Sequence, residues 1–310
     1  AVFVFLICLP VMIAEMAVGR KTEKEPVGAY KTLSGGSKAW GAAGFLGVLT
    51  PFMIAVFYMV LTVWIFGYIA LTLSGNLDYL ASANGFGEFV NSPYLFAAMV
   101  VVAAIVNFIL VAGVKDGIER ASKILMPTLF VMLLIMVFYV LTLDNAFSGV
   151  KFFLIPDVSK LTPAVINGAL SQAFFSLSLG MGILITYGSY INRKTDIVGS
   201  AKLVALTDTA VAFTAGLMIL PAVFSFNPNV NPAELSDSSV SLIFTFLPKI
   251  FLALQGSIGY IGASAVAAFF FTLVFFAAIT SLVSILEVPV SYLVTEKNHS
   301  RKKALSILLM

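Results

Sequence analysis

Hydrophobic residues in this chain are gathered into seven stretches, each long enough to cross a lipid bilayer. The hydrocarbon core of a bilayer is about 30 Å thick, so a spanning helix needs about 20 mainly apolar residues. The stretches lie near residues 1–18, 44–73, 94–113, 124–143, 165–191, 198–226 and 257–295. Backbone amides in lipid must be paired within their own segment, and strand-like alternation is absent. The pattern therefore predicts an all-α, polytopic membrane protein.

Both ends of the chain lie inside hydrophobic sequence. The first stretch has no initiating Met, and the last residues begin an eighth stretch at 304–310. Gly19, Arg20 and Lys21 follow the first stretch directly and offer no small-residue cleavage site, which argues against a secretory signal peptide. We therefore expect one transmembrane domain over residues 1–310, truncated at both ends.

The segment from Asn227 to Gln255 is too interrupted to span a membrane. It contains Pro228 and Pro232, and it carries an apolar stripe through Val240, Ile243, Phe244 and Leu247. A helix with one apolar face lies along a surface rather than crossing the bilayer. The pattern predicts an amphipathic helix over 233–255.

Basic residues indicate how the chain is oriented. Fifteen of the 18 Lys and Arg residues fall in one alternating set of the connecting segments, while the other set carries only Lys151, Lys160 and Lys249. Cytoplasmic loops of membrane proteins are enriched in Lys and Arg, so the first set is predicted to be cytoplasmic. This places the chain in a cell inner membrane or plasma membrane, with 233–255 on the extracellular face.

Composition excludes several classes of protein. Hydrophobic residues make up 60% of the chain and charged residues 11%, so most of its surface must face lipid. The net charge of +3 and the lack of a binding motif give no reason to expect a nucleic-acid partner. With one His, one Cys and no HExxH motif, the sequence does not predict an enzyme.

Three acidic residues interrupt the apolar stretches: Glu15, Asp208 and Glu287. An ionised carboxylate at the centre of a membrane helix costs roughly 2.5–3.5 kcal/mol, so each needs a partner or a function. We interpret Glu15 and Glu287 as buried hydrogen-bonding or helix-packing acids.

The stretch 165–191 contains the run Phe-Phe-Ser-Leu-Ser-Leu-Gly-Met-Gly at 174–182. Two Ser and two Gly at mid-depth favour a helix that breaks near 176–182. Where a transporter helix unwinds, its free carbonyls coordinate cations and its amides receive anionic groups. The alternative is close helix packing through small residues.

Two polar stripes occur on other spans. One consists of Ala277, Thr280, Ser281, Ser284 and Glu287, and the other of Ile54, Tyr58 and Thr62. Ser and Thr hydroxyls suit a small hard cation, although helix packing would use them equally well. A phenol at mid-depth, as at Tyr58, requires a hydrogen-bond partner.

Four motifs in collinear order resemble the neurotransmitter:sodium symporter family. They are Glu-Met-Ala-Val-Gly-Arg at 15–20, Phe-Tyr at 57–58, the run 174–182 with Ile-Thr-Tyr-Gly-Ser-Tyr at 185–190, and Phe-Ala-Ala-Ile-Thr-Ser at 276–281. The resemblance covers essentially all 310 residues. It implies the inverted-repeat secondary transporter fold of the bacterial leucine transporter type, with helices two to eight and the start of nine present.

The resemblance also implies roles for individual residues. Tyr58 would hydrogen-bond the carboxylate of an amino-acid substrate, and Phe175 would form an aromatic lid and outer gate above it. The side-chain subsite would be lined by Ile54, Ser178, Met181, Ser281 and Ile285. Two sodium ions are expected in the full-length protein, one bound by Ser176 and Asp208, the other by the carbonyl of Ala277 and the hydroxyls of Thr280 and Ser281. Tyr190 and Glu296 would form a cytoplasmic gate pair.

Asp208 departs from the commonest family pattern, which has Asn at that place. Ala212 follows one turn later, where other members have Ser or Glu. In the family a chloride ion or a nearby carboxylate offsets the sodium charge, so Asp208 could supply that negative charge itself. We therefore expect no requirement for chloride. The alternative is an Asp208 paired to a group of the family's first helix, with no metal.

The apolar residues Ile54, Met181 and Ile285 favour a hydrophobic L-amino acid as the substrate. The predicted function is sodium-coupled amino-acid symport by alternating access within a lipid bilayer. Two alternatives share the same pocket: an amino-acid sensor that does not transport, and a sodium-independent exchanger. The resemblance leaves a homodimer open.

Overall fold

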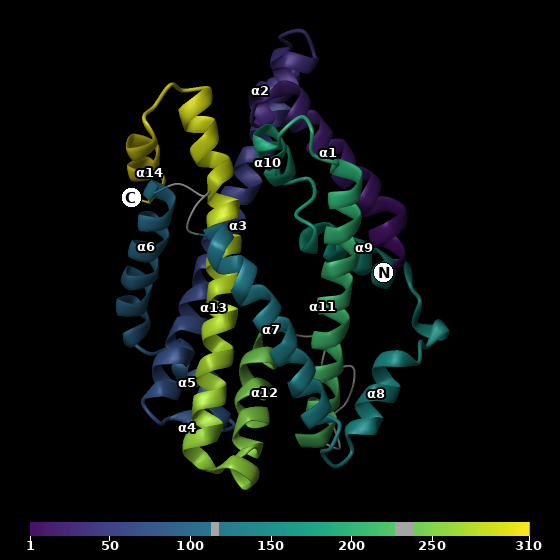
Figure 1. Ribbon diagram of the computed structural model, residues 1–310, viewed down its shortest axis with the longest axis vertical. Helices are drawn as coiled ribbons and strands as arrows, with labels where there is room; N and C mark the ends of the chain where they lie inside the picture. The colour runs from purple at the N-terminus through teal and green to yellow at the C-terminus, as the bar shows by residue number, and fades with distance from the viewer. Residues whose placement is uncertain (113–117, 227–238, 310) are drawn as a thin grey trace.

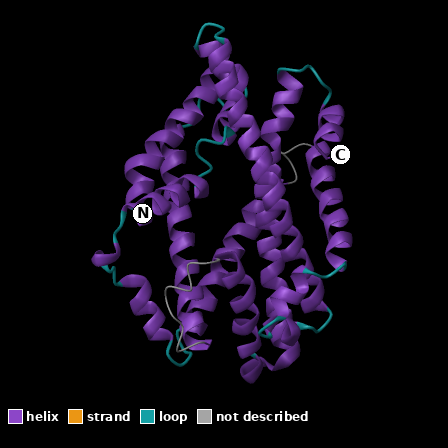
Figure 2. Ribbon diagram, turned by 180° about the vertical axis from the view of Figure 1, so that it is seen from behind, coloured by secondary structure: helices purple, strands orange, loops and turns teal. Residues whose placement is uncertain are grey.

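The computed structural model describes residues 1–112, 118–226 and 239–309 (Figure 1). All regular structure within these ranges is helical (Figure 2), which confirms the all-α fold class. The longer helices are α1 (Leu9–Thr22), α3 (Lys38–Leu73), α6 (Tyr94–Ala112), α7 (Ile118–Val140), α9 (Pro163–Ser176), α11 (Ile197–Phe226), α12 (Ser239–Ala253) and α13 (Gln255–Thr295). The shorter elements are η1 (Val4–Cys8), α2 (Pro26–Leu33), α4 (Leu77–Ala81), α5 (Gly85–Val90), α8 (Ala146–Leu154), η2 (Val158–Lys160), α10 (Ile183–Tyr190) and α14 (Arg301–Leu309).

Four of the described helices are long and apolar enough to cross a membrane. They are α3, residues Tyr94–Val111 of α6, α11 and α13. The other three predicted stretches are divided or shortened. The first is split into the π-helical turn η1 and α1, the fifth is split into α9 and α10, and the apolar part of α7 is Met126–Val140.

The helices pack as two groups (Figure 1). We call α3, α4, α5, α6, α12, α13 and α14 the scaffold group, in which α13 lies along α3. We call η1, α1, α8, α9, α10 and α11 the bundle group, in which α1 lies along α10 and contacts α11. The bundle group has a hydrophobic cluster of its own, made of Val4, Cys8, Met12, Ala173, Leu177, Leu179, Ala201 and Ala205. The larger cluster includes Met218 and Ala222 of α11, so the two groups also share apolar contacts, and α7 packs against both α11 and α13.

Glycines bring the backbones of α1 and α10 into contact. A Cβ atom on Gly188 would lie 2.6 Å from the carbonyl oxygen of Met16, and one on Gly19 would overlap the carbonyl of Ile185. Only glycine fits at such an approach. The two motifs quoted from 15–20 and 185–190 therefore face each other.

The amphipathic segment is described from residue 239 onward, where α12 covers Ser239–Ala253. Phe244 and Leu247 are buried against the scaffold group, and the Phe244 carbonyl accepts a hydrogen bond from the Tyr68 hydroxyl at 3.0 Å. Ile243 instead is exposed. Residues 233–238 of the predicted helix lie outside the described residues.

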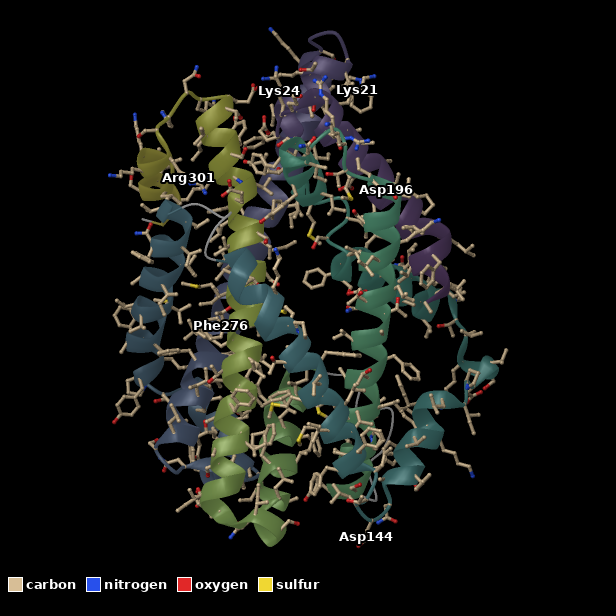
Figure 3. The ribbon with its side chains drawn as sticks, in the orientation of Figure 1. Lys21, Lys24, Asp144, Asp196, Phe276 and Arg301 are labelled. Carbon is tan, nitrogen blue, oxygen red and sulfur yellow. The ribbon has the colours of Figure 1, made fainter. Side chains whose placement is uncertain are left out.

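Three basic side chains from predicted cytoplasmic segments lie toward the same end of the molecule. Figure 3 shows Lys21, Lys24 and Arg301 toward one end and Asp144 at the opposite end. All three basic residues come from segments that the charge pattern assigns to the cytoplasm. The fold thus brings these segments together at one end, as that prediction requires.

Candidate substrate and ion site

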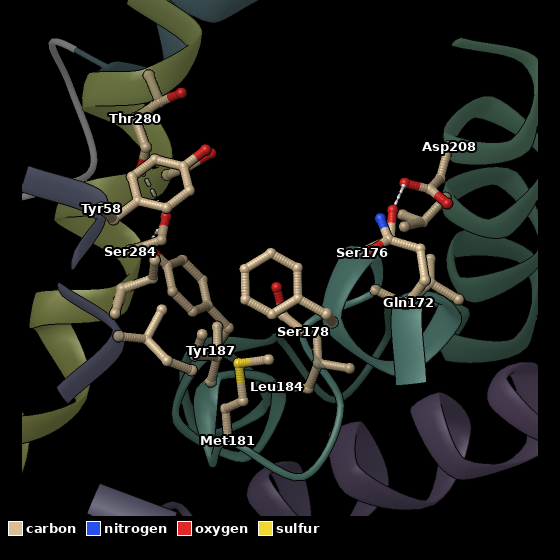
Figure 4. Close-up of a pocket in the computed structure, with 17 residues that line it drawn as sticks. Tyr58, Gln172, Ser176, Ser178, Met181, Leu184, Tyr187, Asp208, Thr280 and Ser284 are labelled. Atoms are coloured by element: carbon tan, nitrogen blue, oxygen red, sulfur yellow. Dashed lines mark hydrogen bonds between the residues drawn. The ribbon is translucent and has the colours of Figure 1, made fainter. Parts of the chain in front are cut away.

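A cavity of about 600 Å³ lies between the scaffold and bundle groups. Figure 4 shows Tyr58, Thr280 and Ser284 on one side of it and Gln172, Ser176 and Asp208 on the other. Its lining residues are Ile54, Tyr58, Gln172, Phe175, Ser176, Leu177, Ser178, Met181, Ile183, Leu184, Tyr187, Val204, Asp208, Thr280, Ser281, Ser284 and Ile285. A cavity of this size with mostly apolar walls and a few convergent polar groups is typical of a small-molecule site.

All seven residues assigned to the substrate line this one cavity, although they come from three separate parts of the chain. Ile54 and Tyr58 lie on α3, and Ser281 and Ile285 lie on α13. Phe175, Ser178 and Met181 lie at the end of α9 and in the segment that follows it. Of the five residues assigned to sodium, all but Ala277 also line the cavity.

The segment between α9 and α10 is not helical. Helix α9 ends at Ser176 and α10 begins at Ile183. Ser178, Gly180 and Gly182 have positive φ angles of 57°, 74° and 68°. Such angles interrupt the helical pattern of hydrogen bonds. The amides of Leu177, Ser178 and Leu179 still donate to carbonyls of the last turn of α9, so the break frees the amides further along, at Met181 and Gly182.

Glu15 supports this broken segment from the neighbouring helix α1. Its Oε1 accepts a hydrogen bond from the amide of Gly180 at 2.8 Å. Its Oε2 is buried without a hydrogen-bond partner among the described residues. The carboxylate thus pairs with one of the amides that the break leaves without a helical partner. This contact agrees with the interpretation of Glu15 as a hydrogen-bonding acid.

The residues assigned to the first sodium are in direct contact. The Ser176 hydroxyl donates to Asp208 Oδ1 at 2.6 Å, joining the end of α9 to α11 (Figure 4). Among the ion pairs between described residues, none includes Asp208. A half-buried carboxylate with hard oxygen neighbours and no counter-charge is suited to a small cation.

The residues assigned to the second sodium lie within one turn of α13. The Thr280 hydroxyl donates to the carbonyl oxygen of Ala277 at 2.9 Å. The two oxygens therefore already face the same point, and Ser281 lines the cavity beside Thr280. A cation bound there would contact the Ala277 carbonyl oxygen and a lone pair of the Thr280 hydroxyl, whose hydrogen would turn away from that carbonyl.

The structure does not bring the gate pair Tyr190 and Glu296 together. Glu296 forms an ion pair with Lys31 of α2, in which Lys31 Nζ donates a hydrogen bond to Glu296 Oε2 at 2.7 Å. This hydrogen bond raises the pKa of Lys31 above its usual value. Tyr190 donates instead to Glu287 Oε1 at 3.2 Å, and Glu287 is bound by Arg301 at 2.6 Å. Glu296 follows Glu287 by nine residues, roughly 13 Å along the helix, which is too far for one phenol to reach both. The third gate residue, Phe175, is 44% exposed at the cavity.

Seven lining residues were not predicted: Gln172, Leu177, Ile183, Leu184, Tyr187, Val204 and Ser284. Ser284 belongs to the polar stripe on α13, and Tyr187 lies in the 185–190 motif, so both carried a signal in the sequence. Gln172 and Val204 carried none, because each is an ordinary residue of a spanning stretch. Their positions at the cavity depend on how the fold places α9 and α11, which the Ser176–Asp208 hydrogen bond joins.

Comparison with known proteins agrees with this geometry. A sequence model of the sodium:neurotransmitter symporter family matches residues 80–310. The chain is 37% identical to the uncharacterized sodium-dependent transporter YhdH of Bacillus subtilis, over 97% of this chain and 65% of that protein. It is 36% identical to an uncharacterized sodium-dependent transporter of Haemophilus influenzae, over 98% of this chain and 67% of that protein.

A solved structure is also similar. The crystal structure of MhsT in complex with L-phenylalanine superposes with a TM-score of 0.89 at 40% sequence identity, covering 99% of this chain and 68% of MhsT. The chain thus spans about two thirds of the length of its relatives. Sequence, helix packing and the broken segment at the cavity all lead to one assignment. The chain belongs to the sodium:neurotransmitter symporter family, whose members are multi-pass membrane transporters.

Proposed function

We propose that this chain forms the binding core of a sodium-coupled symporter for hydrophobic L-amino acids. The observation that carries the proposal is the non-helical segment 177–182, which lies beside a cavity lined by apolar side chains and a few polar groups. Amides and carbonyls there suit the charged ends of an amino acid, while Ile54, Met181 and Ile285 suit an apolar side chain. MhsT, which is similar over 99% of this chain, was solved with L-phenylalanine bound.

Coupling follows from linkage between ligand binding and the positions of the two helix groups. Sodium at Ser176 and Asp208 would order the broken segment, and the amino acid would complete the cavity. Each ligand shifts the equilibrium between outward and inward states only by its difference in affinity for them. A monovalent ion moving inward across 100 mV contributes roughly 2.3 kcal/mol, which supports uphill uptake.

Uptake into proteoliposomes tests the function. Labelled L-phenylalanine should accumulate when an inward sodium gradient is imposed on the full-length protein, and choline in place of sodium should abolish accumulation. Sodium-dependent binding without uptake would indicate the sensor instead. Uptake driven by internal amino acid, and indifferent to sodium, would indicate the exchanger.

Two sodium sites and independence from chloride form the finer part of the proposal. The contacts Ser176–Asp208 and Ala277–Thr280 supply two separate groups of oxygens, and of these four residues all but Ala277 line the cavity. The carboxylate of Asp208 supplies a negative charge beside the first of them. Uptake should therefore persist when chloride is replaced by gluconate, and a collapse of uptake would refute this part alone.

A further inference from the structure

Tyr187 and Ser284 form a hydroxyl pair on the cavity wall to which the proposed function gives no role. Tyr187 lies on α10 and Ser284 on α13, and the two side-chain oxygens are 2.9 Å apart. Both residues line the cavity near Met181 and Leu184 (Figure 4). Both are only partly buried. The pair therefore faces the space in which the proposed amino-acid substrate would bind.

The hydrogen bonds fix the direction in which the pair donates. The Ser284 hydroxyl donates to the carbonyl oxygen of Thr280 at 2.9 Å. A hydroxyl carries a single hydrogen, so Ser284 can only accept from Tyr187, and Tyr187 uses its own hydrogen in that bond. No described residue donates to the Tyr187 oxygen in return. The phenol oxygen is left at the cavity as an acceptor with unused lone pairs.

The surroundings of this acceptor limit what could satisfy it. Ile54, Met181, Leu184 and Ile285 make the neighbouring wall apolar. A charged or strongly polar side chain would lose its hydration there without adequate replacement. A matching side chain is therefore largely apolar and carries one donor at its end. Indole N–H and phenol O–H groups have this character.

We propose that Tyr187 is a specificity-determining residue of this site, accepting a hydrogen bond from an N–H or O–H at the end of an aromatic substrate side chain. The inference rests on the proposed function and deepens it. It predicts that tryptophan and tyrosine are preferred to aromatic amino acids that lack the donor. One buried hydrogen bond of this kind changes affinity by about five- to tenfold.

Equilibrium binding to the full-length protein in sodium tests the inference with four ligands. We expect L-tyrosine to bind about five- to tenfold more tightly than L-phenylalanine, and L-tryptophan more tightly than 1-methyl-L-tryptophan. In Tyr187→Phe the tyrosine preference should disappear and the tryptophan preference should shrink to the steric effect of the methyl group. Affinity for L-phenylalanine should change little.

Tyr190→Phe is the matched control. Tyr190 lies one turn further along α10, its hydroxyl bonds to Glu287, and it does not line the cavity. The affinity ratios should match those of the wild-type protein in this variant. An equal loss of affinity for all four ligands in Tyr187→Phe would assign Tyr187 a purely structural role and overturn the inference.

The affinities of L-tyrosine and L-phenylalanine are compared in the wild-type protein, so this test can be made even if Tyr187→Phe fails to fold. Equal wild-type affinities for these two ligands would overturn the inference and leave the proposed function standing. Absence of sodium-dependent binding for all four ligands would refute the proposed function itself.

Discussion

The phenol of Tyr58 lies near the middle of α3, faces the cavity, and has no hydrogen-bond partner among the described residues. A half-buried phenol normally finds a partner, which is why its position at mid-depth indicated a ligand contact in the sequence. The sequence alone did not indicate which of Tyr187 and Tyr190, three residues apart on α10, faces the cavity. Which of the two faces the cavity depends on how α10 is rotated against α13.

Tyr58→Phe should weaken binding of the amino acid about 10- to 100-fold, because the carboxylate loses a hydrogen bond to a charged group. Equilibrium binding of labelled phenylalanine in sodium measures the effect. Tyr94→Phe is the control, since Tyr94 is 83% exposed and does not line this cavity. Equal affinities of the two variants would contradict the role given to Tyr58.

Asp208→Asn should raise the sodium concentration for half-maximal binding about 10- to 100-fold, because the site loses its negative charge. Added chloride should restore part of the sodium affinity in the variant and have no effect on the wild-type protein. Asp196→Asn removes the same charge from an exposed residue just before α11, and it should leave the sodium dependence unchanged. Normal sodium dependence in Asp208→Asn would indicate instead that Asp208 binds no metal.

At the scale of elements, the decisive feature is the interruption between α9 and α10. Gly182 has a φ of 68°, and a Cβ atom there would lie 2.6 Å from the carbonyl oxygen of Gly47. Both the backbone angle and the approach of α3 therefore require glycine. The small residues of 174–182 suggested an interruption in the sequence, but close helix packing explained them equally well. The positive φ angles of Ser178, Gly180 and Gly182 distinguish the two explanations, because a continuous helix packed through small residues would not contain them.

Gly182→Ala should reduce stability and binding together, because a methyl group cannot be placed without moving α3 or the broken segment. We expect a loss of about 2 kcal/mol or more, in the range of strained backbone positions. Thermal unfolding in detergent and sodium-dependent binding measure it. Gly168→Ala is the control, since Gly168 is helical with open space around its Cβ position. Similar unfolding temperatures for the two variants would contradict the requirement for glycine.

For the whole molecule, orientation in the membrane is predicted from the distribution of Lys and Arg, and Figure 3 shows Lys21, Lys24 and Arg301 of the predicted cytoplasmic set toward one end. Lys38 at the start of α3 and Asn84 beyond its end are both exposed. Since α3 is long enough to span, the two positions should lie on opposite sides of the bilayer.

Lys38→Cys should react with a membrane-impermeant thiol reagent only from the cytoplasmic side, and Asn84→Cys only from the extracellular side. Labelling of intact cells and of inverted vesicles measures this. The native chain has one cysteine, the buried Cys8, so background labelling should be low. Reaction of both positions from the same side would refute the assigned topology.

Hydropathy along the chain was enough to predict the helical class, because that class depends on how apolar each segment is. The residue types available for a site were likewise known before any packing was considered. Tertiary structure decided which polar side chains meet. Tyr190 contacts Glu287 rather than Glu296, Lys31 takes Glu296, and Tyr187 pairs with Ser284 across two helices. Such pairs depend on the rotation and axial offset of packed helices. Side-chain packing between helices sets both quantities, and hydropathy along a single chain does not encode them.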